Sequence, residues 1–163
     1  MASPLEIDCR WNPSGSGETV RGVLGTLPQW FGIPEALAGY VAEAERSPTL
    51  IATVERRVVG VLTLVRHSPD AAEIYLMAVL PECHRAGVGR RLVNETRRSL
   101  QAESVRFLQV KTLSSRHPDA GYTKTRAFYE AMGFTVLEEF PNLWGPAAPA
   151  VQLVTYLPRV TAR

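Results

Sequence analysis

One stretch of the chain reads Val79-Leu-Pro-Glu-Cys-His84-Arg85-Ala86-Gly87-Val88-Gly89-Arg90-Arg91-Leu92-Val93. The apolar run Ile74–Leu80 leads into it, two glycines follow, and a helical pattern then begins, so the stretch predicts a strand, a loop and a helix N-terminus. Glycines let backbone N–H groups turn toward one point, and the first turn of a helix leaves N–H groups without partners at its positive end. Such a loop suits phosphate or pyrophosphate, and Arg85 and Arg90 add positive charge.

Two glycines spaced G-x-G are also what a tight turn requires, so the better-known phosphate loops provide a test. The dinucleotide fingerprint needs a third glycine where this chain has Leu92, and the P-loop needs a Lys that does not follow Gly89. Both patterns fail. What remains is His84-x-x-Gly87-x-Gly89 directly after a strand.

This pattern resembles the acyl-CoA pyrophosphate loop of the GNAT superfamily of N-acyltransferases, which reads Gln or Arg, two residues, Gly, one residue, Gly or Ala. His84 stands where Gln or Arg is usual. The later run Thr125-Arg126-Ala127-Phe128-Tyr129-Glu130-Ala131-Met132-Gly133-Phe134 resembles a family helix that ends in Tyr, three residues and Gly-Phe. The two elements follow the family's order, and the resemblance covers roughly residues 5–157.

The resemblance implies that acetyl-CoA is the co-substrate and that the strand end, the loop and the later helix contact it. The expected cofactor-binding residues are Met77, Ala78, Val79, His84, Arg85, Ala86, Gly87, Val88, Gly89, Arg90, Thr125 and Arg126. Backbone N–H groups of Met77 or Ala78 would hold the oxyanion, and Val79 would pair with the pantetheine amides. The alternative for Arg126 is a solvated charge on a helix.

Acyl transfer to an amine requires a group that removes a proton, because an amine with a pKa near 10.4 is neutral in only about one part in 10³ at pH 7. Glu73 is the candidate base: it lies in an apolar strand where a carboxylate would be partly desolvated, and the resemblance places a Glu on this strand in that role. The alternative for Glu73 is a solvated charge at a strand end.

By the same resemblance, Tyr129 is the catalytic proton donor to the CoA sulfur, with Phe128 and Met132 supplying the core face and leaving the phenol free. The alternative is an ordinary tyrosine of an amphipathic helix. The family often has Asn seven residues earlier, where this chain has Tyr122.

The residues that would bind the acceptor amine have the weakest signal in the sequence. Trp30 and Phe31 lie between the first two predicted helices, and Trp144 lies in the last loop, where the family builds the walls of its acceptor site. Tyr75, on the strand face of Glu73, completes the candidate substrate residues. Aromatic residues in loops form either a lid or a local core.

Composition limits the other functions. The chain has 163 residues, 45% of them hydrophobic, and a formal net charge of +2, which predicts one domain over residues 1–163. No basic stripe with aromatics supports nucleic-acid binding, and no apolar run approaches the ~20 residues of a membrane span. Two cysteines and three histidines show no disulfide or metal pattern, and the N-terminus does not resemble a signal peptide, so we expect a soluble, cytoplasmic protein without a metal.

The predicted element order is β-α-α-β-β-β-α-β-α-β-β, which favours an α/β (α+β) domain. The resemblance makes the sheet mixed and mostly antiparallel, with flanking helices and two splayed central parallel strands, at 73–79 and 105–112. The leading interpretation is direct acetyl transfer to a small-molecule or protein amine in a ternary complex, and a homodimer is compatible with it. The alternatives are a non-catalytic acyl-CoA-binding sensor or scaffold, and a nucleotide- or phosphate-binding domain.

Overall fold

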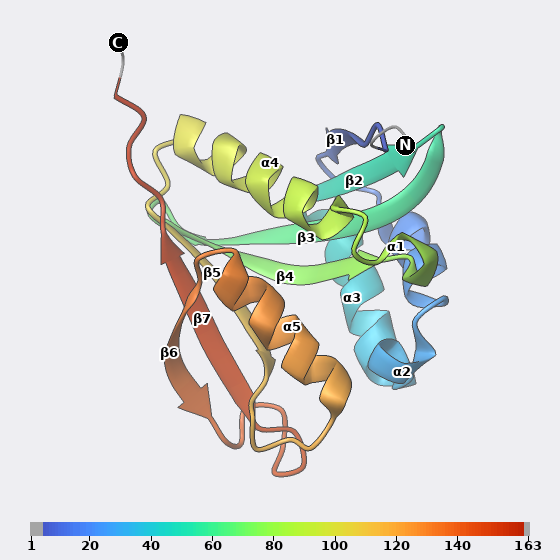
Figure 1. Cartoon of the computed structure of the whole chain (residues 1–163), viewed down its shortest axis with the longest axis vertical. Helices are drawn as coiled ribbons and strands as arrows, with labels where there is room; N and C mark the ends of the chain where they lie inside the picture. Colours follow the sequence, from blue (N-terminus) through green and yellow to red (C-terminus); the bar gives the residue numbers. More distant parts are fainter. Residues whose placement is uncertain (1–4, 162–163) are drawn as a thin grey trace. The chain divides into compact units, whose positions relative to one another are not determined.

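The computed structural model describes residues 5–161 and contains two compact units (Figure 1). The first holds residues 5–65 and Tyr75–Arg98, and the second holds Arg66–Ile74 and residues 99–161. The strand order is β1-β2-β3-β4-β5-β7-β6, and β3 and β4 continue from one unit into the other.

The described residues form five helices, seven strands and one 3-10 turn at Pro81–Cys83. The helices are α1 (Gly17–Leu24), α2 (Pro28–Phe31), α3 (Pro34–Arg46), α4 (Val88–Ala102) and α5 (Ala120–Ala131). The strands are β1 (Asp8–Asn12), β2 (Thr49–Val54), β3 (Arg57–Ser68), β4 (Ala71–Val79), β5 (Phe107–Leu113), β6 (Thr135–Phe140) and β7 (Ala150–Tyr156). The predicted order of the strands and the longer helices is confirmed, with the short α2 as an addition, and the mixed, mostly antiparallel sheet with one parallel pair is confirmed as well.

The segment 29–33 was expected to be a link, and this expectation is wrong in part, because α2 forms there. Helix α1 already ends at Leu24, and the fixed φ and missing N–H of Pro28 suit the first position of a new helix. The single turn of α2 places Trp30 and Phe31 on a helix rather than in a loop.

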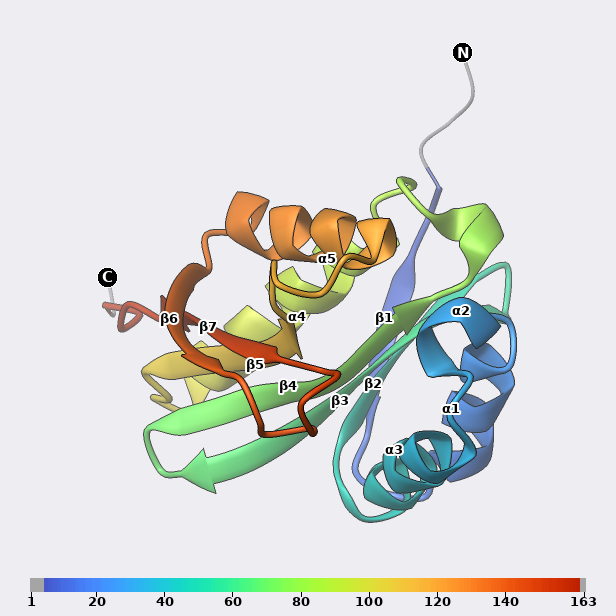
Figure 2. The ribbon, with the colours of Figure 1, turned by 90° about the horizontal axis from the view of Figure 1, so that it is seen from below.

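In the first unit, helices α1 and α3 lie side by side (Figure 2), and α1 buries Val20, Val23 and Leu24. Helix α4 packs closely on β3 at Gly60: a Cβ there would lie 2.9 Å from Val88 Cγ1 and 3.2 Å from Leu92 Cδ1. The absence of a side chain at Gly60 therefore lets the start of α4, and with it the preceding loop, approach the sheet.

In the second unit, β5 is the central strand. It pairs in parallel with β4 over Ala71–Ile74 and antiparallel with β7 over its whole length. This pairing confirms the predicted parallel pair. It ends at Ile74 and Val110, although β4 runs on to Val79. Alternate side chains of β5 are buried, and α5 lies against this strand (Figure 1). The other face of β5 is only half-buried and carries polar groups.

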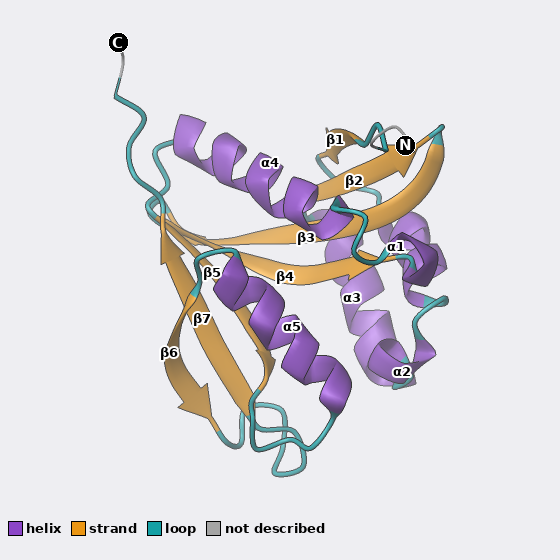
Figure 3. Cartoon of the chain, viewed as in Figure 1, coloured by secondary structure: helices purple, strands orange, loops and turns teal. Residues whose placement is uncertain are grey.

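The segment from Pro141 to Pro149, between β6 and β7, consists of turns (Figure 3). Within residues 5–161, the helices lack the combination of length and apolar character that crossing a membrane requires.

Candidate active site

The loop between β4 and α4 has the backbone geometry that its glycines predicted. Gly87 has φ +88°, in the left-handed region that side chains rarely adopt, and Arg85 has φ +63°. The amide of Arg91 donates to the Gly87 carbonyl at 2.9 Å, which begins the helical hydrogen bonding. The N–H groups of Val88, Gly89 and the next residue therefore stand in the first turn, where a helix supplies no internal partners. We call residues Pro81–Arg90 the phosphate loop, after the ligand that the sequence predicts for them.

His84, at the position where the family has Gln or Arg, points back to the strand. Its Nε2 lies 2.8 Å from the Val79 carbonyl oxygen, and because a carbonyl only accepts, the ring nitrogen is the donor. The edge of the ring meets Trp30, with centroids 6.2 Å apart. His84 thus holds the carbonyl that we expected to pair with pantetheine, and it brings one predicted acceptor residue to the loop.

A series of aromatic rings links three elements of the first unit. Phe31 of α2 meets Tyr40 of α3 edge-to-face at 5.6 Å, and Tyr40 meets Tyr75 of β4 at 5.8 Å. Phe31 and Tyr75, both predicted substrate residues, are therefore joined through Tyr40, which the sequence reasoning missed because it sits in an ordinary helical pattern. Trp144 belongs to the second unit, where 47% of its surface is exposed.

Glu73 lies at the centre of a polar cluster in the second unit. Its side chain is only 9% exposed, so the expected desolvation is confirmed and the solvated strand-end alternative is wrong. Lys111 Nζ lies 3.0 Å from Oε1 and 3.1 Å from Oε2 of this carboxylate, Gln109 donates to Oε2 at 3.4 Å, and His67 Nε2 is hydrogen-bonded to Oε2. The catalytic role of Glu73 stays a prediction.

Sheet register explains how these groups meet. Glu73 stands directly opposite Gln109 in the parallel pair, and Lys111 lies two residues further along the same face of β5. On β7, Gln152 stands opposite Lys111 and donates to Gln109. The five residues that we call the Glu73 cluster are His67, Glu73, Gln109, Lys111 and Gln152. Four of them escaped the sequence reasoning. Gln109 and Lys111 had one signal, as polar residues at alternate positions of the apolar strand 105–112, whereas His67 and Gln152 lie on other strands.

Tyr129 occupies a core position of the second unit. It is 4% exposed and meets Phe128 and Phe134 edge-to-face, at 5.3 and 5.4 Å. The expectation that Phe128 would take the core face and leave Tyr129 outside it is wrong, because Phe128 is only half-buried. The turn at Gly133, with φ +88°, folds Phe134 back so that its amide donates to the Tyr129 carbonyl at 3.0 Å.

Burial raises the pKa of Tyr129 above its ordinary value near 10, because the phenolate would be desolvated. The hydroxyl therefore stays protonated over the whole physiological range, as a proton donor requires.

Thr125 and Arg126 attach α5 to its surroundings. Arg126 donates from Nη1 to the Leu113 carbonyl at 2.8 Å and from Nη2 to Thr123 at 3.2 Å, while Thr125 donates to the Gly121 carbonyl at 3.3 Å. Arg126 thus fixes the helix to the end of β5, and its predicted phosphate contact stays a prediction.

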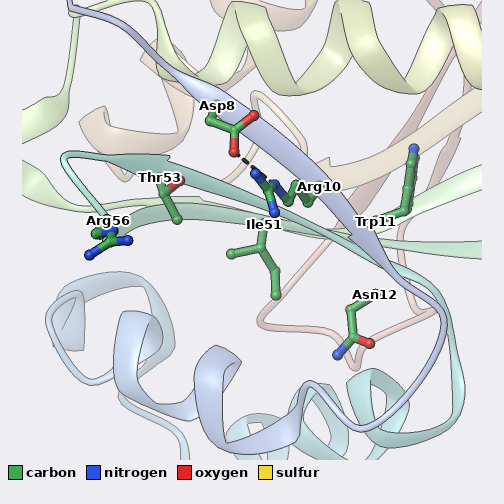
Figure 4. Close-up of a pocket in the computed structure, with 7 residues that line it drawn as sticks. All are labelled: Asp8, Arg10, Trp11, Asn12, Ile51, Thr53 and Arg56. Atoms are coloured by element: carbon green, nitrogen blue, oxygen red, sulfur yellow. Dashed lines mark hydrogen bonds and ion pairs between the residues drawn. The ribbon is translucent and has the colours of Figure 1, made fainter.

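A separate depression lies on β1 and β2 of the first unit (Figure 4). It is lined by Asp8, Arg10, Trp11, Asn12, Ile51, Thr53 and Arg56. Asp8 and Arg10 form an exposed ion pair of 2.9 Å there. None of the predicted site residues lines this depression, so the depression is not part of the candidate active site.

Comparison with known proteins identifies the class. Residues 40–136 match the family model of the acetyltransferase (GNAT) domain, which is more than half of the chain. The chain therefore belongs to the GNAT acetyltransferase family, a family of transferases. A search of curated proteins finds no match.

Solved structures share the fold at low identity. A GNAT-family acetyltransferase structure from Desulfovibrio desulfuricans, described there as putative, is 18% identical, covers 94% of this chain and 100% of its own, and has a TM-score of 0.80. An aminoglycoside 6'-N-acetyltransferase complexed with coenzyme A is 16% identical over 89% of this chain and 93% of its own, with a TM-score of 0.70. The ribosomal-protein-S18-alanine N-acetyltransferase from Escherichia coli is 17% identical over 95% and 97%, with a TM-score of 0.68.

Proposed function

We propose that this protein is an N-acetyltransferase that moves the acetyl group of acetyl-CoA to a primary amine by direct transfer in a ternary complex. The observation that carries the proposal is the phosphate loop, a left-handed Gly87 followed at once by a helix N-terminus, in a chain that belongs to the GNAT family. A similar fold binds coenzyme A in the aminoglycoside enzyme, which supports acetyl-CoA as the co-substrate.

The phosphate loop would bind the pyrophosphate mainly through backbone N–H groups, with Arg85 and Arg90 adding charge and Thr125 and Arg126 as further candidate contacts. The amides of Met77 and Ala78 would stabilise the oxyanion, and Val79 would hold pantetheine once His84 releases its carbonyl.

Tyr129 would protonate the departing sulfur, and the Glu73 cluster would remove the proton from the amine. Burial keeps the tyrosine in its neutral, proton-donating form. Trp30, Phe31, Tyr75 and Trp144 are the proposed acceptor residues. The two N-acetyltransferases compared above are named for an aminoglycoside and for the alanine of a ribosomal protein, so the acceptor of this chain is proposed only as a small-molecule or protein amine. We also propose that residues 1–163 form one cytoplasmic domain.

The test combines calorimetry with acetyl-CoA and a thiol-release assay over aminoglycosides, polyamines, amino acids and peptides. We expect binding, thiol release with at least one amine, an amide product and intersecting initial-velocity lines. Parallel lines with an acetylated enzyme would replace direct transfer by a covalent route. Binding without release would identify a non-catalytic acyl-CoA module, and no binding would refute both functions.

A further inference from the structure

We propose that His67 is the catalytic base that takes the proton of the acceptor amine, and that Glu73 acts as its positioning residue. The inference rests on the proposed N-acetyl transfer and names the atom that performs one of its steps. Both residues belong to the second unit, in the hairpin of β3 and β4, and a hydrogen bond joins His67 Nε2 to Glu73 Oε2.

Exposure separates the two candidates for the base. The His67 side chain is 45% exposed, whereas that of Glu73 is 9% exposed. A substrate that approaches from solvent on this face therefore reaches the imidazole, while the carboxylate lies beneath its own partners.

The groups that contact Glu73 are also those that fix a carboxylate in position. Lys111 contacts both carboxylate oxygens, and Gln109 and His67 take further positions on Oε2. If Glu73 took the substrate's proton, it would lose the ion pair with Lys111, and a partly buried lysine, 23% exposed, would be left without its counter-ion at a cost in stability. With Lys111 Nζ on both of its oxygens, the Glu73 carboxylate is placed as a hydrogen-bond acceptor in this cluster.

An ionised carboxylate accepts hydrogen bonds and cannot donate one, so Glu73 holds the proton of the neutral imidazole on Nε2. The lone pair then lies on Nδ1, which can accept a proton. The division of roles is that of a histidine base oriented by a carboxylate that never takes the proton itself.

The charged groups that face His67 are Glu73 of β4 and, beyond it, Lys111 of β5. The charged neighbours of His67 in the hairpin have partners of their own, since Arg66 pairs with Glu103 and Asp70 with Arg106.

The proposed acetyl transfer conserves protons and electron pairs. The acceptor ammonium gives one proton to His67 Nδ1, and the freed lone pair forms the C–N bond to the thioester carbonyl. The C–S bond breaks with its electrons on sulfur, Tyr129 protonates that sulfur, and the second amine proton passes to water, from which Tyr129 is reprotonated. The imidazolium then returns its proton to solvent, so the products are the amide, the CoA thiol and one proton.

The test compares His67→Gln, Glu73→Gln and the double variant, with His117→Gln as the control, because His117 lies in the same unit outside the cluster. The acceptor is the amine with the fastest thiol release in the panel above. We expect His67→Gln to lower kcat by about 10²- to 10⁴-fold, the usual range for a general base, and to remove the acidic limb of the pH profile of kcat/KM. The KM for acetyl-CoA and the activity of His117→Gln should stay near wild type.

Glu73→Gln should also lower kcat, and the double variant should be no slower than His67→Gln alone, since the two residues act as one unit. Wild-type kcat and pH profile in His67→Gln, beside an inactive Glu73→Gln, would show that Glu73 is itself the base and would overturn the proposal. Independent multiplicative losses would overturn it as well.

A second measurement needs no acceptor. Nitrogen-15 NMR of the imidazole should show the Nε2–H tautomer of His67 in the wild type and altered ring signals in Glu73→Gln. An Nδ1–H tautomer of His67 would overturn the proposal, and so would His67 ring signals that are the same in wild type and Glu73→Gln. Acetyl-CoA binding without thiol release to any amine would instead refute the proposed function, and the base assignment would fall with it.

Discussion

The phosphate loop and the Glu73 cluster depend on different parts of the polypeptide. The loop presents backbone: Gly87 has a left-handed φ, and a Cβ built on it meets no atom within 4 Å, so only its conformation requires glycine. The cluster presents side chains, and each depends on a neighbour from another strand. The loop should therefore tolerate most side-chain changes outside its glycines, whereas the cluster should respond to the loss of any one partner.

The largest expected effect is on the loop. Gly89→Asp places a negative charge in the first turn of α4, where the phosphates are proposed to bind, and should weaken acetyl-CoA binding by about 10²-fold or more, because like charges in contact cost several kcal/mol. The fold should survive, since an acidic residue suits a helix N-terminus. Calorimetry beside a melting curve measures both.

Gly22→Asp is the matched control, because Gly22 lies in α1 of the same unit with open space around it. Unchanged affinity in a folded Gly89→Asp protein would remove the phosphate-loop interpretation.

Tyr129→Phe tests a side-chain role at a site that keeps its packing. The rings of Phe128 and Phe134 would still meet a phenyl ring, so stability and acetyl-CoA affinity should change little. We expect kcat to fall by about 10- to 10³-fold through loss of the proton donor to sulfur. Steady-state thiol release provides the measurement, and Tyr156→Phe, on an exposed tyrosine of β7, is the control. A fully active variant would show that the family role does not apply to Tyr129.

Lys111→Met tests whether the cluster depends on each partner. It leaves the buried Glu73 carboxylate without its cation and should lower the free energy of unfolding by about 1–3 kcal/mol. The double variant with Glu73→Gln should recover part of this loss, because the unpaired charge is then gone. Denaturant titration measures the free energy of unfolding of each variant, with Lys124→Met, at an exposed lysine, as the control. Equal stability of Lys111→Met and wild type would show that the ion pair contributes nothing to folding.

The smallest expected effect concerns pH. Because burial raises the pKa of Tyr129 in the folded state, its stabilising contribution is complete below the unfolded value near 10 and is lost as pH rises through the folded pKa. At pH 11, unfolding is favoured by at most about 1.4 kcal/mol relative to pH 7, from linkage at this group. Melting curves of wild type and Tyr129→Phe over this range should therefore converge or cross at alkaline pH. Parallel curves would show that the hydroxyl is not desolvated.

Much of this molecule was predictable because its signals are local. The order of strands and helices followed from apolar periodicity, and the glycines at 87 and 133 marked the two turns whose φ values are +88°. The short helix α2 was missed because it is a single turn, and because a proline such as Pro28 is a signal both for the end and for the start of a helix. Tyr129 was identified, but its packing was assigned to Phe128, since a helical pattern alone does not say which of two adjacent aromatic residues faces the sheet.

From the sequence alone, the class of protein, the turn at Gly87 and the helix that carries Tyr129 could be predicted, because each rests on residues that lie within a few positions of one another. The pairing of Glu73 with Lys111 and His67 became visible in the folded chain, because these contacts join residues 38 and 6 positions apart in the sequence. Which side chains meet across a sheet depends on strand register, and a shift of one residue turns a side chain to the opposite face. For this reason the phosphate loop could be predicted from its own residues, whereas the partners of Glu73 had to be observed.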